Sequence, residues 1–207
     1  MQCSNFCMEF VKEFAIFLYK NDIIKFGNFT LSSGKQSTYY IDIRLLPSYP
    51  HQYRKIIKNL QNLISEQIGL EKFDTLASVP TGGLVIASSL ATEIVKPLIY
   101  IRKKQKEHGT SKLVEGKTAK GMEILIIDDV ATTGESVVNA LKILKEEGMN
   151  VNHAYVIINR KEGADKLLES EGVRLHQITD ILEITDILYK ENLIDEQMLQ
   201  SVKNQIN

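Results

Sequence analysis

The period of the hydrophobic residues changes along the chain. Near the start, apolar residues recur about every 3.6 positions, which predicts an amphipathic helix. These residues are Phe6, Phe10, Phe14, Phe17 and Leu18. From residue 75 onward, short continuous apolar runs alternate with helical patterns. Continuous apolar runs are typical of strands that helices cover on both faces.

The order of the expected elements defines the fold class. Runs of β-branched and aromatic residues at 29–31 and 39–43 predict a hairpin, and a helix is expected at 51–69. Strands are expected at 75–79, 98–101, 123–127, 151–158 and 173–178. Helices are expected at 84–95, 136–147 and 164–171. This alternation predicts an α/β fold with a doubly wound, mainly parallel sheet, whose ligands lie beyond the carboxyl ends of the strands.

Composition narrows the class of protein. The 207 residues fit a single domain, and a net charge of −1 argues against a generally basic nucleic-acid binder. Only Cys3 and Cys7 occur, so no disulfide framework is expected and a reducing, cytoplasmic location is the simpler interpretation. No apolar run approaches the ~18 residues of a membrane span. Charges at Glu9, Lys12 and Glu13 argue against a signal peptide.

Residues 124–136 carry the most informative chemistry. Asp128 and Asp129 follow a buried apolar run, and a Thr/Gly turn then opens a helix. Consecutive backbone N–H groups at the start of a helix suit a phosphate, and Gly134 permits close approach of the backbone. Two carboxylates need donors or a cation beside them, which a ribose diol and Mg²⁺ would supply. The motif therefore predicts a cradle for a 5-phosphorylated sugar.

Rival phosphate-binding motifs do not match this stretch. The Gly-Lys-Ser/Thr ending of a Walker A loop and the dinucleotide fingerprint Gly-x-Gly-x-x-Gly are both missing. A capped strand–helix turn without a ligand would account for a single Asp-x-Thr-Gly, but accounts poorly for the whole ordered stretch.

Two cationic features add to the cradle. The first is a basic segment within residues 102–112, whose cations could stabilise a pyrophosphate leaving group. Gly109, Thr110, Ser111 and Gly116 suit a flexible loop that could act as a lid. The second is Arg160, which could pair in bidentate fashion with a carboxylate. The plain alternatives are a solvated basic loop and a surface arginine in a salt bridge.

The central motif resembles the 5-phosphoribosyl-1-diphosphate (PRPP) binding motif of type I phosphoribosyltransferases. Two further segments are similar to the orotate phosphoribosyltransferase family. They are residues 26–42, FGNFTLSSGKQSTYYID, and residues 101–116, IRKKQKEHGTSKLVEG. The similarity extends from about residue 10 to about residue 180.

The resemblance implies an Mg²⁺-dependent enzyme that joins orotate to the phosphoribosyl group of PRPP in pyrimidine (UMP) synthesis. It implies the type I phosphoribosyltransferase fold as a single domain over 1–207, with an N-terminal hood at about 1–45 and an α/β core at about 46–180. It also implies a homodimer whose catalytic loop is shared across subunits. Neither nucleic acid nor a membrane is an expected partner, and the sequence leaves a decarboxylase partner open.

The resemblance also assigns roles to single residues. Lys106, His108 and Asp129 are expected to be catalytic. The residues expected to bind PRPP are Thr81, Gly82, Arg102, Lys103, Lys106, His108, Asp128, Asp129, Val130, Ala131, Thr132, Thr133, Gly134, Glu135 and Ser136. Those expected to bind orotate are Tyr40, Ile41, Thr132 and Arg160. Mg²⁺ is expected to be held mainly through PRPP and water, near Asp128 and Asp129, with no direct protein ligand.

The chain departs from the family at two places. Ser32 stands where many members have a lysine, and some have a lysine near Thr81-Gly82; Lys35 is a candidate substitute for one of them. Three other functions share the phosphate motif. They are a phosphoribosyltransferase for another base, a non-catalytic PRPP-sensing regulator that binds nucleic acid, and a PRPP synthase, for which the chain is short and lacks an ATP loop.

Overall fold

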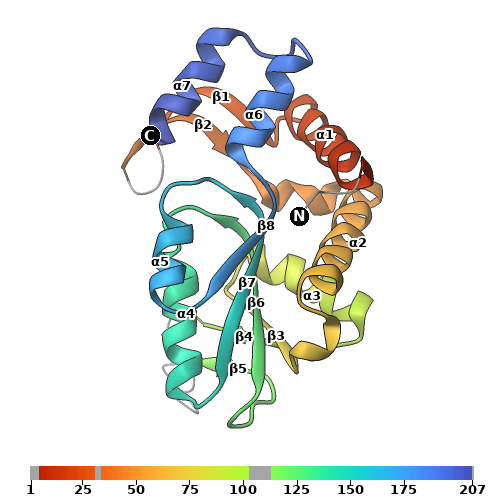
Figure 1. The fold of residues 1–207 in the computed structure, drawn as a ribbon, viewed down its shortest axis with the longest axis vertical. Helices are drawn as coiled ribbons and strands as arrows, with labels where there is room; N and C mark the ends of the chain where they lie inside the picture. Colours follow the sequence, from red (N-terminus) through yellow and green to blue (C-terminus); the bar gives the residue numbers. More distant parts are fainter. Residues whose placement is uncertain (1–4, 31–33, 103–112, 207) are drawn as a thin grey trace. The chain divides into compact units, whose positions relative to one another are not determined.

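A computed structural model describes residues 5–30, 34–102 and 113–206 of the chain (Figure 1). Lys103, Lys106 and His108 of the expected catalytic loop, together with Ser32, lie outside these residues. The chain divides into two compact units. The first unit contains residues 1–48 and 179–207, and the second contains residues 49–178.

Among the described residues, the second unit is built on a six-stranded sheet in the order β5-β4-β3-β6-β7-β8. Strand β3 is parallel to β4 and β6, and β6 is parallel to β7, whereas β5 runs antiparallel to β4. The strands are β3 (Thr75–Ser78), β4 (Leu98–Ile101), β5 (Val114–Glu115), β6 (Glu123–Ala131), β7 (Asn150–Asn159) and β8 (Arg174–Asp180).

Helices cover both faces of this sheet. Figure 1 shows α4 (Glu135–Glu146) and α5 (Ala164–Ser170) on one face and α2 (Pro50–Gln67) and α3 (Gly82–Ile94) on the other. A short 3₁₀ helix, η2 (Leu70–Lys72), joins α2 to β3. Residues 124–127 of β6 are all at most 3% exposed, because side chains on both faces of the strand are covered. The expected doubly wound, mainly parallel sheet is confirmed.

The central strand extends further than the sequence pattern predicts. The pattern ends this strand at Ile127, but β6 continues to Ala131. The extension forms because β7 runs equally far and offers a pairing partner, with Asp128 opposite Val156 and Ala131 opposite Asn159. Both carboxylates therefore lie on regular strand backbone, which fixes the direction of their side chains better than a turn would.

The first unit combines both ends of the chain. It contains α1 (Asn5–Lys20), the antiparallel hairpin β1 (Ile24–Thr30) and β2 (Gln36–Ile41), η1 (Ile43–Ser48), α6 (Ile181–Lys190) and α7 (Glu196–Ile206). The side chain of Gln205 on α7 accepts hydrogen bonds from the backbone N–H of Thr38 at 2.7 Å and from its hydroxyl at 2.9 Å. The last helices thus support the hairpin, a role that the sequence pattern did not indicate. None of the described helices is both long and apolar enough to cross a membrane.

An aromatic cluster joins β7 to β8 in the second unit. His153 and His176 share a hydrogen bond of 3.0 Å between Nδ1 and Nε2, and the His176 ring stacks on Tyr155 with centroids 4.3 Å apart. Burial, followed by the charges of His153 and Arg174, lowers the pKa of His176 to about 4. The folded protein therefore keeps this imidazole neutral at a pH where an unfolded chain protonates it.

This shift predicts a loss of stability in mild acid. Below about pH 6.5 the unfolded chain binds a proton at His176 that the folded chain refuses until about pH 4, so the free energy of unfolding falls across that window. Between pH 7 and pH 5 the His176 contribution falls by about 2 kcal/mol. Urea unfolding at both pH values measures this loss. His176→Phe, which keeps a ring on Tyr155, is expected to lose markedly less, and an equal loss in both proteins would contradict the assignment.

Candidate active site

Two adjacent carboxylates lie near the carboxyl end of β6. Asp128 is 8% exposed, whereas Asp129 is half-buried. Oδ1 of Asp128 accepts the backbone N–H of Asp129 at 2.9 Å, and Oδ2 accepts the hydroxyl of Ser136 at 3.4 Å. Asp128 is thereby tied both to its own strand and to the first turn of α4.

The start of α3 makes room for both carboxylates because its first two residues are the glycines Gly82 and Gly83. A Cβ at Gly82 would overlap the carboxylate of Asp129, and a Cβ at Gly83 would overlap Oδ1 of Asp128. The hydroxyl of Ser78, the last residue of β3, donates to the carbonyl of Ile127 at 2.7 Å. The first residues of α3 therefore lie against the carboxylates, where the positive end of the helix dipole favours negative charge.

Burial makes it unfavourable for both carboxyl groups to be ionised at the same time. Burial first, and then the neighbouring charge of Asp129, raises the pKa of Asp128 to about 8. The carboxylate pair thus retains a proton at neutral pH unless hydroxyl donors or a cation come beside it. The site is therefore prepared for a ligand that supplies them.

The turn after β6 leads directly into a helix. Thr132 and Thr133 are half-buried, and Gly134 is buried with φ of +86°, a conformation that glycine adopts without strain. A Cβ at Gly134 would approach the Cα of Ala164 to 3.2 Å, so the turn packs tightly on the start of α5. α4 then begins at Glu135, with its N-terminus at this turn. Backbone N–H groups of this kind are a ready anion site.

The turn after β7 lies beside the turn after β6. Ala131 is opposite Asn159 in the parallel ladder, and the backbone N–H of Arg160 donates to the carbonyl of Ala131 at 2.8 Å. Thr132 and Arg160 are therefore the first residues beyond two neighbouring strands. The guanidinium of Arg160 is buried and binds the carboxylate of Glu162.

The structure brings most of the predicted residues to one end of the sheet. Residues 128–136, Thr81, Gly82 and Arg160 follow or end β3, β6 and β7. Arg102 follows β4, where its guanidinium pairs with Glu115 at 3.2 Å. Val130 is half-buried and Glu135 exposed.

The two hood residues belong to the first unit. Tyr40 and Ile41 end β2, and the ring of Tyr40 lies 5.8 Å from that of Phe29 between centroids. Lys35 is exposed just before this strand, and its role as a substitute cation stays a prediction.

Sequence reasoning missed the residues that support the site. Ser78 joins the ends of β3 and β6 through its hydroxyl. Asn159 is fully buried, donates from Nδ2 to both oxygens of Asp165 and to Gln177 at 3.0 Å, and accepts the backbone N–H of Lys161 at 2.8 Å. A polar residue at the end of an apolar run was the available signal for Asn159, but its partners lie on other elements.

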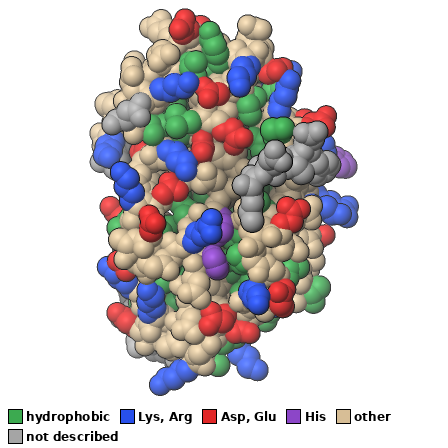
Figure 2. All heavy atoms as spheres, in the orientation of Figure 1, with side chains coloured by type: hydrophobic (Ala, Val, Ile, Leu, Met, Phe, Trp, Pro, Cys, Tyr) green, Lys and Arg blue, Asp and Glu red, His purple; other side chains and the backbone are tan. Residues whose placement is uncertain are grey.

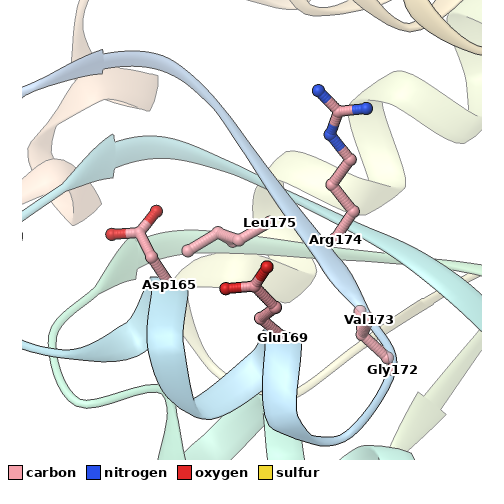
Figure 3. Close-up of a pocket in the computed structure, with 6 residues that line it drawn as sticks. All are labelled: Asp165, Glu169, Gly172, Val173, Arg174 and Leu175. Atoms are coloured by element: carbon pink, nitrogen blue, oxygen red, sulfur yellow. The ribbon is translucent and has the colours of Figure 1, made fainter.

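A hollow of about 560 Å³ lies between α5 and β8. It is lined by Asp165, Glu169, Gly172, Val173, Arg174 and Leu175. Figure 3 shows Arg174 pointing away from the carboxylates of Asp165 and Glu169. Neither Asp128 nor Asp129 lines this hollow, so it is separate from the carboxylate site. Among the described residues, no group of three or more His, Cys, Asp and Glu side chains is arranged to hold a metal ion.

Comparison with known proteins matches this arrangement to one family. Residues 48–186 match the phosphoribosyl transferase domain. An orotate phosphoribosyltransferase from Cenarchaeum symbiosum is 47% identical over 95% of this chain and 98% of the relative. The chain belongs to the orotate phosphoribosyltransferase family. The resemblance carried by the three sequence segments is thereby confirmed.

Solved structures of the family share the fold. The crystal structure of orotate phosphoribosyltransferase from Aeropyrum pernix is 37% identical, with a TM-score of 0.73 over 87% of this chain and 99% of that one. Leishmania donovani UMP synthase is 32% identical, with a TM-score of 0.82 over 94% of this chain. This chain spans 42% of the length of the UMP synthase.

The buried carboxylate predicts a variant that is more stable than the natural chain. A carboxyl whose folded pKa is raised loses stability as pH rises from its unfolded value near 4 to about 8. Asp128→Asn removes this loss, and we expect its free energy of unfolding at pH 7 to be higher by about 1–3 kcal/mol. Urea unfolding in EDTA measures the gain. The gain should shrink toward pH 4, and a less stable variant at pH 7 would show that the charge is not costly.

Proposed function

We propose that the chain transfers the 5-phosphoribosyl group of PRPP to N1 of orotate, giving orotidine 5′-monophosphate and pyrophosphate in pyrimidine synthesis. The observation that carries this proposal is the carboxylate pair on β6, with Asp128 buried, followed at once by a glycine turn and the N-terminus of α4. This order matches the order of a ribose diol and its 5′-phosphate along one substrate. Family membership supports the same reaction.

Within this proposal, residues 128–136 hold the ribose 5-phosphate part of PRPP. Asp128 and Asp129 accept hydrogen bonds from the ribose hydroxyls, in addition to those that Asp128 accepts from Asp129 and Ser136. The backbone N–H groups and hydroxyls of residues 132–136 hold the 5′-phosphate at the start of α4. Thr81 and Gly82 lie on the neighbouring turn, where the backbone can approach the pyrophosphate.

The carboxylate pair also fits Mg²⁺. The raised pKa of Asp128 reflects burial and the adjacent charge of Asp129, and a nearby divalent cation relieves the second of these. We place Mg²⁺ mainly on PRPP and water, with Asp128 and Asp129 beside it. When bound, Mg²⁺ neutralises charge on the pyrophosphate group as it leaves.

Orotate binding is assigned to Arg160, Thr132, Tyr40 and Ile41. Arg160 supplies a planar donor fork for the carboxylate that orotate has and uracil lacks. Thr132 is one residue beyond Ala131, whose carbonyl accepts the Arg160 backbone N–H. Tyr40 and Ile41 are proposed to meet the pyrimidine ring.

The chemistry demands mainly charge stabilisation. The bond from C1 of the ribose to pyrophosphate breaks as N1 of orotate bonds to C1, and the departing oxygen takes the bonding electrons. C1 becomes positive in the transition state, as in glycoside cleavage. Lys103, Lys106 and His108 are proposed to stabilise the pyrophosphate, and Asp129 to hold the ribose in position.

The alternative functions lack comparable support. A regulator that binds nucleic acid requires a DNA-binding helix pair or a basic surface for RNA, and Figure 2 shows acidic and basic side chains interspersed on the face it presents. A phosphoribosyltransferase for a base without a carboxylate would give Arg160 no substrate group to pair with.

The first test is turnover of orotate and its dependence on Arg160. With PRPP and Mg²⁺, the wild-type chain should consume orotate, followed by absorbance, and release pyrophosphate, but should not use uracil or purines comparably. Arg160→Ala is expected to raise KM for orotate by about 10²-fold, since a charged hydrogen-bonded partner is lost, with a much smaller change for PRPP. Equal effects on both substrates would remove the proposed role of Arg160. Absence of orotate turnover by the wild-type chain would remove the proposed function.

We further propose a homodimer in which the loop containing Lys106 completes the partner's site. Lys106→Ala and Asp129→Asn would each be nearly inactive alone. Refolded together in equal amounts, they should recover about a quarter of wild-type activity, because about half the dimers are mixed and each mixed dimer has one intact site. No recovery, with mixed dimers shown to form, would place the loop in its own subunit's site.

A further inference from the structure

Arg160 and Glu162 form a buried ion pair inside the turn that follows β7. Oε1 of Glu162 accepts a hydrogen bond from Nε of Arg160 at 2.9 Å and lies 2.8 Å from Nη2. The Arg160 and Glu162 side chains are only 7% and 12% exposed. Both contacts use a single carboxylate oxygen and one edge of the guanidinium. A guanidinium held in this way keeps its planar set of donors in a fixed orientation.

The backbone that carries this pair is held from several directions. Asn159 accepts the N–H of Lys161 and donates to Asp165 on α5 and to Gln177 on β8. Lys161 has φ of +58°, a left-handed conformation that reverses the chain between the two paired side chains. The turn is therefore fixed, and Glu162 sets where the long, flexible Arg160 side chain ends.

Electrostatics favour the same role. A buried guanidinium without a counter-charge is unfavourable, and a side chain of this length can turn toward water instead. The carboxylate of Glu162 keeps the charge of Arg160 both buried and fixed in direction before any ligand arrives. A binding group that is already ordered loses less side-chain entropy on binding.

We propose that Glu162 is a positioning residue for substrate recognition: it holds the guanidinium of Arg160 in the orientation in which Arg160 binds the carboxylate of the base. This inference rests on the proposed function, in which Arg160 binds orotate. The competing effect is repulsion, because the negative charge of Glu162 opposes a second carboxylate near the same guanidinium. If repulsion dominated, removing the charge would tighten binding of orotate.

Three substitutions separate positioning from charge. Glu162→Gln keeps an Oε1 acceptor in place and removes the charge. Glu162→Asp keeps the charge but withdraws the oxygen by one methylene, and Glu162→Ala removes both. Glu169→Ala is the control, since Glu169 lies on α5 at the hollow in Figure 3 and outside the site.

Steady-state kinetics with both substrates give the readout. Positioning predicts that the Ala and Asp variants raise KM for orotate by about 5–10-fold, while KM for PRPP stays within about twofold. The Glu169→Ala control should remain close to wild type, and the Gln variant, which keeps the acceptor but loses the counter-charge, should fall between wild type and the Ala variant. In the Arg160→Ala background, Glu162→Asp should have no further effect on orotate.

The other possible kinetic results would each contradict either the positioning role of Glu162 or the proposed function. Lower KM for orotate in the Gln and Ala variants would establish repulsion and overturn the proposal. An unchanged KM in the Asp variant would do the same, and this variant serves where Glu162→Ala fails to fold. Parallel changes in KM for both substrates would indicate a merely structural role. A wild-type chain that turns over no orotate would overturn the proposed function together with this inference.

Discussion

The site depends on the burial of one carboxylate, that of Asp128, beside another. Carboxylates in water need no special surroundings, but Asp128 is covered by the turn of α3 and is 8% exposed. Its pKa rises accordingly, to about 8. The fold accepts this cost because β6 pairs with β3 as far as Ile126 and with β7 as far as Ala131, which fixes the backbone that carries Asp128. A ligand with hydroxyl donors, accompanied by a cation, relieves this cost. The unliganded protein is therefore less stable than it would be without the buried charge, and the ligand binds more tightly.

Two neighbouring turns, one after β6 and one after β7, carry the groups that select the substrate. The equal reach of β6 and β7 places Thr132 and Arg160 side by side, and Gly134 packs closely on Ala164 at the start of α5. One turn offers backbone N–H groups at the start of a helix, and the other offers a guanidinium held by Glu162. Phosphate recognition and recognition of the base are thereby built on adjacent strands of one rigid sheet.

The sequence predicted the features formed by consecutive residues but not the contacts between residues far apart in the chain. Asp128, Asp129 and the turn to Ser136 were readable because strand, carboxylates and helix start follow one another directly. The end of β6 at Ala131 was not, because it depends on how far β7 extends. The pairing of Asn159 with Asp165 and Gln177 joins three elements, and the support of the hairpin by Gln205 joins residues 167 apart or more. The direction of Arg160 depends on a side-chain conformation that no spacing encodes.

The central claim is that residues 128–136 hold the ribose 5-phosphate part of PRPP. A crystal structure of the chain with PRPP and Mg²⁺ tests it most directly. The account predicts the ribose hydroxyls within hydrogen-bond distance of Asp128 and Asp129, and the 5′-phosphate against the N–H groups of residues 132–136 at the start of α4. Density for PRPP elsewhere in the molecule, with this turn empty, would contradict it.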